Sequence, residues 1–233
     1  MQKKNSYNTV PYLLIAAAFV LFSMLFSIHF WSFNESFYRY EHSKLKLYGK
    51  GIAEYIGISE DDLDRLTSFT LDYLNDPDAD LNIQMNVNGK ERKIFTDDEK
   101  AHMVDVQRLN LSANTLLVIS SLISFAGLAF CIAKNRIYHL FHAYRKVLSY
   151  VLLVICILVV WIVIDFDSFW TMFHHLFFPG NDLWLLDLRK DILIMIVPPE
   201  FFNHLVLMIV STFLLIIIAS YLAIRKASGK DVR

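Results

Sequence analysis

The sequence predicts a mainly α-helical integral membrane protein, with four transmembrane helices and a small α+β extracytoplasmic cap that contains a β-hairpin. The 233-residue chain is 55% hydrophobic and 19% charged, whereas soluble domains average about 45–50% and about 25%. Its charges are absent from four long stretches, each long enough to cross a hydrocarbon core of about 30 Å as a helix. Alternating apolar residues on both sides of Asn88-Gly89 predict the β-hairpin.

The charge-free stretches divide the chain into seven predicted segments. The third stretch is the shortest, with about 18 residues, which is near the lower limit for a membrane span. The segments are an inside flank with the first transmembrane helix (1–31), a cap (32–111), the second transmembrane helix (112–133), a cytoplasmic loop (134–146), the third transmembrane helix (147–164), an aromatic interfacial loop (165–203), and the fourth transmembrane helix with a cytoplasmic tail (204–233).

The distribution of basic residues predicts the orientation of the chain. The three short flanks are all basic: Lys3 and Lys4 precede the first span, and the segments 134–146 and 225–233 each hold four Lys or Arg residues. The two long connections hold more acidic than basic residues. Because Lys and Arg beside membrane helices stay on the cytoplasmic side, we expect both termini inside and the cap outside. A net charge of −1 does not indicate a nucleic-acid-binding protein, which is typically basic.

The first half of the cap is expected to be helical. Tyr38–Tyr55 mixes aromatic, basic and acidic residues and is predicted to run as one helix into Gly57. Ser59 is the expected N-cap of a second helix, whose apolar residues recur at helical spacing. This helix is expected to end before Asp76-Pro77.

The second half of the cap is expected to contain the hairpin and one more helix. Apolar residues alternate from Leu81 to Val87, Asn88-Gly89 follows, and a second run ends at Phe95, which is the pattern of a hairpin with a two-residue turn. Because a two-stranded hairpin is marginal alone, it is expected to pack on cap helices or on the membrane surface. Thr96 or Asp97 then caps a helix over Asp98–Asn110 that leads into the second span.

The connection between the third and fourth spans differs from an ordinary polar loop. It holds more aromatic residues than an interfacial belt requires, interleaved with Leu, Ile and Met. We therefore expect it to lie in the membrane interface rather than to project into water. Its aromatic residues are Phe166, Phe169, Trp170, Phe173, Phe177, Phe178, Trp184, Phe201 and Phe202.

Two histidine sites are the candidates for chemistry. His102 has Glu99 and Asp105 each three residues away, so both carboxylates can share its helix face and orient the imidazole. His174 and His175 follow the third span, and the predicted topology places them in the same leaflet as His102. Two imidazoles at one depth, inside an aromatic enclosure, are able to act as general base and general acid. The competing interpretation of the His102 segment is a solvated charged helix.

Other kinds of site have weaker support. Glu99-x-x-His102 has the spacing found in one helix of di-iron proteins, but such sites need a second copy and two further Glu residues. We therefore expect no metal and no cofactor. The chain has no Gly-x-Ser-x-Gly motif. Cys131 and Cys156 lie in apolar stretches, where they are expected to face lipid or to pack. The spans lack the central charges of an ion pathway.

Five motifs in their order and spacing resemble the lipoprotein intramolecular transacylase family over essentially the whole chain. They are Asp98–Val106, Phe173–Phe178, Asn181–Asp187, Asp191–Ile194 and Pro198–Phe202. The resemblance implies a bacterial plasma-membrane acyltransferase with two catalytic histidines at the boundary of cap and membrane. It implies transfer of the sn-2 acyl chain of a diacylglyceryl-modified lipoprotein to the α-amino group of the same N-terminal cysteine, which gives the N-acyl S-monoacylglyceryl lyso-form.

The chemistry that the resemblance implies suggests roles for individual residues. His102 and His174 are the expected catalytic pair. Because His174 and His175 are adjacent, either of them could be the second catalytic histidine. Which histidine acts as base and which as acid is also open. Glu99 and Asp105 are expected to support them, and Asn181, Arg189 or amides near Gly180 to stabilise an oxyanion. The expected substrate-binding residues are Tyr48, Phe173, Phe177, Asn181, Trp184, Asp187 and Arg189.

The implied partners are the diacylglyceryl lipoprotein and membrane lipid, with no nucleic acid. Two alternative functions remain open from the sequence. One is an intermolecular acyltransferase that takes its acyl chain from a phospholipid. The other is a non-enzymatic membrane sensor or scaffold with a ligand-binding cap.

Overall fold

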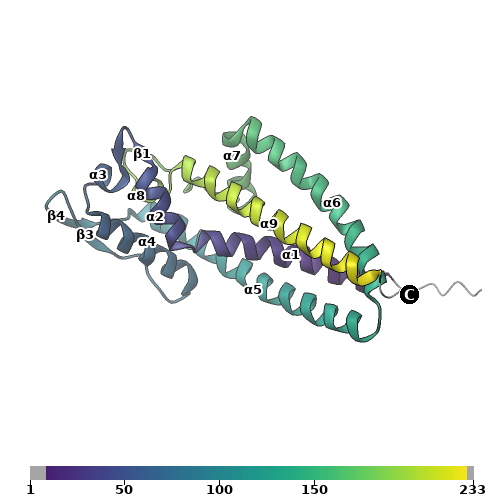
Figure 1. Ribbon diagram of the computed structural model, residues 1–233. Coiled ribbons are helices and arrows are strands. Elements are labelled where there is room, and N and C mark those ends of the chain that lie inside the picture. Colours follow the sequence, from purple (N-terminus) through teal and green to yellow (C-terminus); the bar gives the residue numbers. More distant parts are fainter. Residues whose placement is uncertain (1–8, 230–233) are drawn as a thin grey trace, which may run out of the picture. The chain divides into compact units, whose positions relative to one another are not determined.

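The computed structural model describes residues 9–229 and confirms the predicted fold class (Figure 1). Lys3 and Lys4, and the tail residues from Lys230 on that entered the charge argument, lie outside the described residues. Four described helices are long and apolar enough to cross a membrane: α1 (Val10–Ser32), α5 (Asp97–Ala133), α6 (Ile137–Ile164) and α9 (Pro199–Ser228).

These helices are longer than the predicted spans. α5 begins 15 residues before Ser112, because the capped polar helix predicted at the end of the cap continues without a break into the apolar stretch. α6 includes most of the basic connection 134–146, which leaves a short turn around Asn135 with positive φ. α9 begins at Pro199, whose fixed φ suits the first turn of a helix.

The chain forms two compact units. The apolar unit comprises, among described residues, 9–27, 115–169 and 210–229, and the cap unit comprises 28–114 and 170–209. In the apolar unit, Tyr12, Ala16 and Val20 line one face of α1 and are buried against residues of α6 and α9. Gly127 of α5 is required by close packing, because a Cβ there would lie 2.5 Å from Cγ1 of Ile15.

The start of the cap unit corrects one prediction. The expected helix over Tyr38–Tyr55 is wrong, because the chain forms α2 (Glu35–Lys44), a short hairpin of β1 (Lys46–Leu47) and β2 (Lys50–Gly51), and then α3 (Ile52–Ile56). The hairpin turn has positive φ at both Tyr48 and Gly49, as a type I′ turn requires. The helix end at Gly57 is confirmed, with Gly57 in the left-handed conformation.

The rest of the cap follows the predicted order. α4 (Glu60–Asn75) begins at Ser59, whose side chain accepts a hydrogen bond from the Asp62 amide, and it ends before Asp76-Pro77. β3 (Gln84–Val87) pairs antiparallel with β4 (Lys90–Lys93) across Asn88-Gly89, so the predicted hairpin is confirmed. Met85 and Val87 of its inner face are buried in the cap core together with Leu63 and Leu66 of α4.

The aromatic connection 165–203 is largely helical. It forms α7 (Phe166–Phe177), α8 (Ile192–Ile196) and the first turn of α9. α8 lies beside α3 (Figure 1), and its Ile192, Leu193, Met195 and Ile196 side chains are buried in the cap core. The segment between α7 and α8 is therefore anchored to the cap at its C-terminal end.

Candidate active site

The cap unit brings together two histidines that are 72 residues apart in the chain, His102 of α5 and His174 of α7. Their ring centroids are 6.2 Å apart and their planes differ by 36°. Both side chains are buried, with relative exposures of 7% and 5%. Two imidazoles in such a place are close enough to act on one small group.

The His174 ring has a fixed tautomer. Its Nδ1 lies 2.7 Å from the backbone oxygen of Trp170, one helical turn earlier. A carbonyl oxygen only accepts hydrogen bonds, so Nδ1 carries the proton and Nε2 keeps its lone pair. Trp184 stacks on the ring at 4.6 Å and 22°, and Trp170 meets it edge-on at the same centroid distance.

The His102 ring is enclosed by aromatic neighbours but less constrained. Phe178 lies edge-on to it, with ring centroids 5.4 Å apart. Its Nδ1 is buried and has no hydrogen-bond partner among the described residues. A buried polar atom without a partner is costly, so this nitrogen is a candidate for contact with a substrate.

Both histidines lie outside the four predicted transmembrane stretches, and burial controls their protonation. Burial, and secondarily the neighbouring His174, lowers the pKa of His102 to about 4, against a smaller opposing effect of the Asp105 carboxylate. Burial also lowers the pKa of His174, although the hydrogen bond to the Trp170 carbonyl opposes this shift. Both imidazoles are therefore neutral at pH 7.

Glu99 does not act on the His102 ring as its spacing suggested. Its carboxylate is fully buried and accepts two backbone hydrogen bonds, from the amides of Thr96 and Leu193, each at 2.7 Å. The Thr96 side chain in turn accepts from the Glu99 amide at 3.2 Å, which completes a capping box. Glu99 therefore joins the first turn of α5 to the start of α8.

Asp105, one turn after His102, makes a second such link. One carboxylate oxygen accepts a hydrogen bond from the Asn181 side-chain amide at 3.1 Å, and the other lies 3.6 Å from Arg108. The segment 181–193, here called the strap, is thus bonded to α5 at both ends by the two carboxylates that flank His102. Trp184, which stacks on His174, lies within the strap.

The two adjacent histidines of α7 occupy different surroundings. His174 is buried against His102, whereas His175 is exposed. The His175 ring meets Trp184 edge-on, with centroids 5.4 Å apart. Of the two, His174 is the one that the structure places beside His102.

The other predicted site residues fall into two groups. Phe173 lies beside His174 at 5.4 Å between centroids and contacts Phe177 at 4.8 Å. Asp187 and Arg189 instead pair with each other at 3.2 Å in an exposed part of the strap, and this pairing raises the pKa of Arg189. Tyr48 lies in the β1–β2 turn, is 69% exposed and contacts Tyr55.

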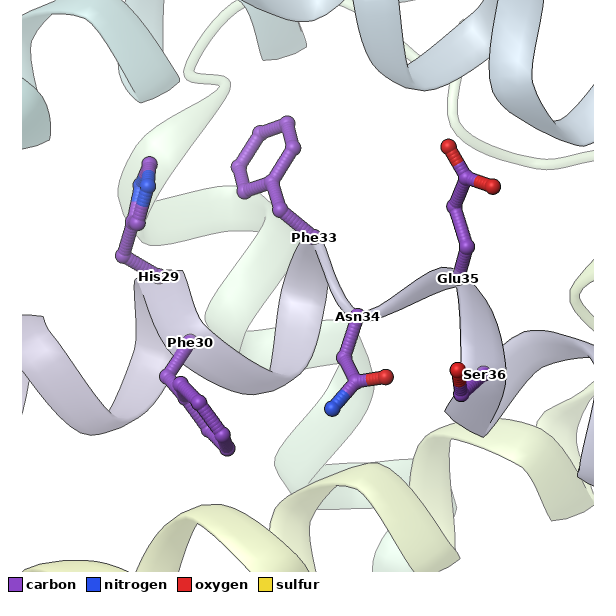
Figure 2. A pocket seen from close by; sticks show the side chains of 6 residues that line it. All are labelled: His29, Phe30, Phe33, Asn34, Glu35 and Ser36. Atoms are coloured by element: carbon purple, nitrogen blue, oxygen red, sulfur yellow. The ribbon is translucent and has the colours of Figure 1, made fainter.

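Two cavities in the cap unit have neither His102 nor His174 among their lining residues. The larger, of about 490 Å³, is at the junction of α1 and α2 (Figure 2). There His29 and Phe33 point to one side of the α1 ribbon and Phe30 to the other. The smaller, of about 330 Å³, lies along the strap and is lined by Asp98, Asn181, Asp191 and their neighbours. The described residues contain no group of three or more His, Cys, Asp or Glu side chains that is able to hold a metal ion.

The comparisons with known proteins decide the family. The model of the family "Lit: Lipoprotein intramolecular transacylase Lit" matches residues 13–202. The chain belongs to the lipoprotein intramolecular transacylase (Lit) family. As a member of this family it is an acyltransferase. No curated protein matches the sequence at a significant level.

Three solved structures share the fold of this Lit family member. The membrane integral lipoprotein intramolecular transacylase Lit from Bacillus cereus is 20% identical, with 95% of each chain covered and a TM-score of 0.76. Forms of that protein with a histidine-to-arginine or a histidine-to-alanine mutation are each 19% identical with TM-scores of 0.70, and cover 95% of this chain and 92% or 93% of theirs. The likeness supports an integral membrane protein with four apolar helices.

Sequence reasoning missed several residues around the histidines of this Lit family member. Trp170 and Phe178 are each four residues from His174, so helical spacing could have identified both. Thr96-x-x-Glu99 is a capping-box pattern that could have assigned the Glu99 carboxylate. His42 of α2 is 5% exposed and bonds to the Ile196 carbonyl at 2.9 Å. No sequence signal predicts that contact.

Proposed function

We propose that this Lit family member moves the sn-2 acyl chain of an S-diacylglyceryl-cysteine lipoprotein to the α-amino group of the same cysteine, with His102 and His174 transferring the protons. The observation that carries the proposal is the pair of buried, neutral imidazoles 6.2 Å apart in an aromatic enclosure. The product is the N-acyl S-monoacylglyceryl lyso-form. Nucleophile and ester belong to one molecule, so the reaction needs no acyl-enzyme.

Proton counting supports two neutral imidazoles. An α-ammonium, with a pKa of about 8, carries three N–H bonds, and the amide product carries one. Two protons therefore leave the nitrogen as the new N–C bond forms and the C–O bond to the glyceryl group breaks. One proton ends on the departing glyceryl oxygen and the other is released to solvent. Neutral imidazoles are suitable acceptors for both.

The hydrogen bonds around the two rings suggest a division of these roles. His174 has its proton fixed on Nδ1, so its Nε2 lone pair is available to accept a proton from the substrate nitrogen. His102 has an Nδ1 without a partner in the described chain, so its ring is free to accept the second proton and to donate it to the glyceryl oxygen. His175, exposed and edge-on to Trp184, is not part of this pair.

The aromatic enclosure has a physical task in this reaction. Trp170, Phe178 and Trp184 surround the imidazoles with apolar surface, which suits acyl chains and excludes water that would hydrolyse the ester. The ester carbonyl and the amine are separated by the glyceryl thioether, and holding them together supplies an effective molarity of up to about 10⁵–10⁸ M. Positioning thus replaces covalent catalysis.

Single-residue variants test the two-histidine proposal. His102→Ala and His174→Ala are each expected to abolish the lyso-form while the protein still inserts in the membrane, because each removes one proton acceptor. Mass spectrometry of the lipoprotein N-terminus measures the conversion. His175→Ala is the matched control, with conversion retained. Normal conversion by both His102→Ala and His174→Ala contradicts the proposal. If His175→Ala loses conversion while His174→Ala retains it, the catalytic role belongs to His175 instead of His174.

An assay with purified components separates the alternative functions. The purified protein is incubated with diacylated lipoprotein in detergent without added phospholipid. Intramolecular transfer gives the lyso-form under these conditions, an enzyme that uses a phospholipid donor gives none until phospholipid is added, and a sensor or scaffold gives none in either case.

The proposed orientation places both termini in the cytoplasm and the cap outside a bacterial plasma membrane, where mature lipoproteins are exposed. The basic residues 134–146 and 225–233 support it. A reporter enzyme that works only in the cytoplasm is expected to be active when fused after Gly229. A reporter enzyme that works only outside the cytoplasm is expected to be inactive there, and its activity would contradict the orientation.

A further inference from the structure

Acyl transfer to an amine passes through a tetrahedral intermediate whose carbonyl oxygen becomes an oxyanion. The amine lone pair forms the N–C bond while the π pair of the ester carbonyl moves onto that oxygen. The intermediate then collapses, the pair returns, and the C–O bond to the glyceryl group breaks. A hydrogen-bond donor at the oxygen is commonly the largest single contribution to catalysis of this kind.

The two side-chain donors suggested by the sequence are already engaged. The Asn181 side-chain amide donates to Asp105 at 3.1 Å. The Arg189 guanidinium donates to Asp187 at 3.2 Å, in a part of the strap where its side chain is 76% exposed. Neither side chain belongs to the aromatic enclosure around the two histidines, where an oxyanion donor is required.

Trp184 carries a donor in the right surroundings. Its indole ring stacks on His174 with centroids 4.6 Å apart, and its Nε1 is buried without a hydrogen-bond partner among residues 9–229. Indole N–H is a donor only, and a buried indole normally finds an acceptor. A buried N–H left unpaired beside the proposed proton acceptor calls for an acceptor that arrives with the substrate.

The strap holds this ring in a defined place. Asn181, three residues before Trp184, is bonded to Asp105, and Leu193 at the other end is bonded to Glu99. Within the strap, the Leu186 amide donates to the Trp184 carbonyl at 3.0 Å and the Leu183 amide to the Asn181 side chain at 3.2 Å. A donor fixed before the reaction needs no reorganisation when the charge develops, which is what makes such donors effective.

We propose that the indole N–H of Trp184 donates the hydrogen bond that stabilises the oxyanion during acyl transfer. The inference rests on the proposed function of the His102–His174 pair, because it assigns a further catalytic residue to the same reaction. It accounts for the unpaired buried N–H. It also explains why two carboxylates adjacent to His102 bind the strap rather than the imidazole.

The test removes the N–H while keeping an aromatic ring. In Trp184→Phe, and in a variant with 3-benzothienylalanine at position 184, which keeps the bicyclic shape and replaces N–H by sulfur, kcat is expected to fall about 10²–10³-fold with a synthetic S-diacylglyceryl-cysteine lipopeptide. KM is expected to change little. The melting temperature of the 3-benzothienylalanine variant is expected to stay the same or rise, because an unpaired buried donor is removed. Trp31→Phe is the control for loss of one indole, with unchanged kcat.

The outcomes separate this inference from the proposed function. If either N–H-free variant keeps wild-type kcat, or if the 3-benzothienylalanine variant fails to fold, the inference is overturned. If these variants are impaired as expected but His102→Ala and His174→Ala retain conversion, the proposed function fails instead. If His102→Ala and His174→Ala are inactive and the 3-benzothienylalanine variant is fully active, the histidine proposal stands and the oxyanion donor is another group.

Discussion

Two buried serines of the apolar unit and two carboxylates of the cap unit have hydrogen-bond partners at different distances along the chain, although Tyr144 of the apolar unit also reaches Ser220 over 76 residues. In the apolar unit, Ser27 donates to the Ser23 carbonyl and Ser124 to the Ser120 carbonyl, each one turn back on its own helix. In the cap unit, Glu99 binds the Leu193 amide 94 residues away, and Asn181 binds Asp105 76 residues away. Local bonds satisfy a helix in lipid, whereas the distant bonds fix one segment against another, as a catalytic site requires.

This comparison predicts that the largest effect comes from Glu99. Glu99→Ala leaves the buried amides of Thr96 and Leu193 without their acceptor, and an unsatisfied buried donor costs about 1–3 kcal/mol. Because two donors are affected, we expect a loss of about 2–6 kcal/mol in the stability of the cap unit, together with loss of activity. Hydrogen exchange, read at the Leu193 amide, measures the change directly.

The control for Glu99 is its isosteric variant. Glu99→Gln keeps one acceptor oxygen but replaces the other by a donor that faces a backbone N–H, so it is expected to be destabilised less than Glu99→Ala and to keep partial activity. Protection of the Leu193 amide that is equal in the wild type and in Glu99→Ala would show that the bond between α5 and the strap is not important in solution.

A smaller effect is expected at Asp105, and it has a pH signature. Since burial lowers the pKa of His102 to about 4 and Asp105 raises it, the acidic fall of kcat/KM is expected below the ordinary histidine value of about 6.5. Asp105→Asn retains an oxygen that accepts from Asn181 but loses the charge that favours imidazolium. Its acidic fall is therefore expected to shift to lower pH, with activity near neutral pH largely retained.

Asp105→Ala separates the two roles of this residue. It removes both the charge and the acceptor for Asn181, so kcat is expected to fall as well, because one end of the strap is released. The measurement is a pH profile of kcat/KM for the three proteins side by side. A shift of the Asp105→Asn profile to higher pH would contradict the sign assigned to the Asp105 charge.

The same contrast explains what the sequence could predict. The four apolar helices, the Ser59 cap, the hairpin at Asn88-Gly89 and the helix that continues from the cap into the second span all depend on residues within a few positions of one another. Local patterns report such features well. The hydrophobic stretches also predicted that His102 and His174 lie on the same side of the spans, and the structure places their rings 6.2 Å apart.

The partners of Glu99 and Asp105 could not be predicted by the same reasoning. Spacing along a helix identifies neighbours at three or four residues, and this suggested His102 for both carboxylates. The actual partners are in the strap, which the chain reaches only after crossing two apolar helices. The Tyr48-Gly49 turn was missed because tyrosine rarely adopts positive φ, and the hairpin there has only two residues in each strand.

The smallest effect is expected in the apolar unit, from Ser27→Ala. The Ser27 hydroxyl is buried but bonds only to its own helix at 2.8 Å. Hydrogen bonds between membrane helices average about 0.6 kcal/mol, and a bond within one helix is expected to contribute no more. Gln107→Met in the cap unit is the contrasting variant, since methionine is similar in size to glutamine. The Gln107 side-chain amide donates to the Tyr73 and Asp76 carbonyls, which are more than 30 residues away in the chain. Thermal unfolding in detergent is expected to show a clear loss for Gln107→Met and almost none for Ser27→Ala. Equal losses of melting temperature would mean that distant hydrogen bonds contribute no more than local ones. They would contradict the claim that the bonds of Glu99 and Asp105 hold the strap against α5.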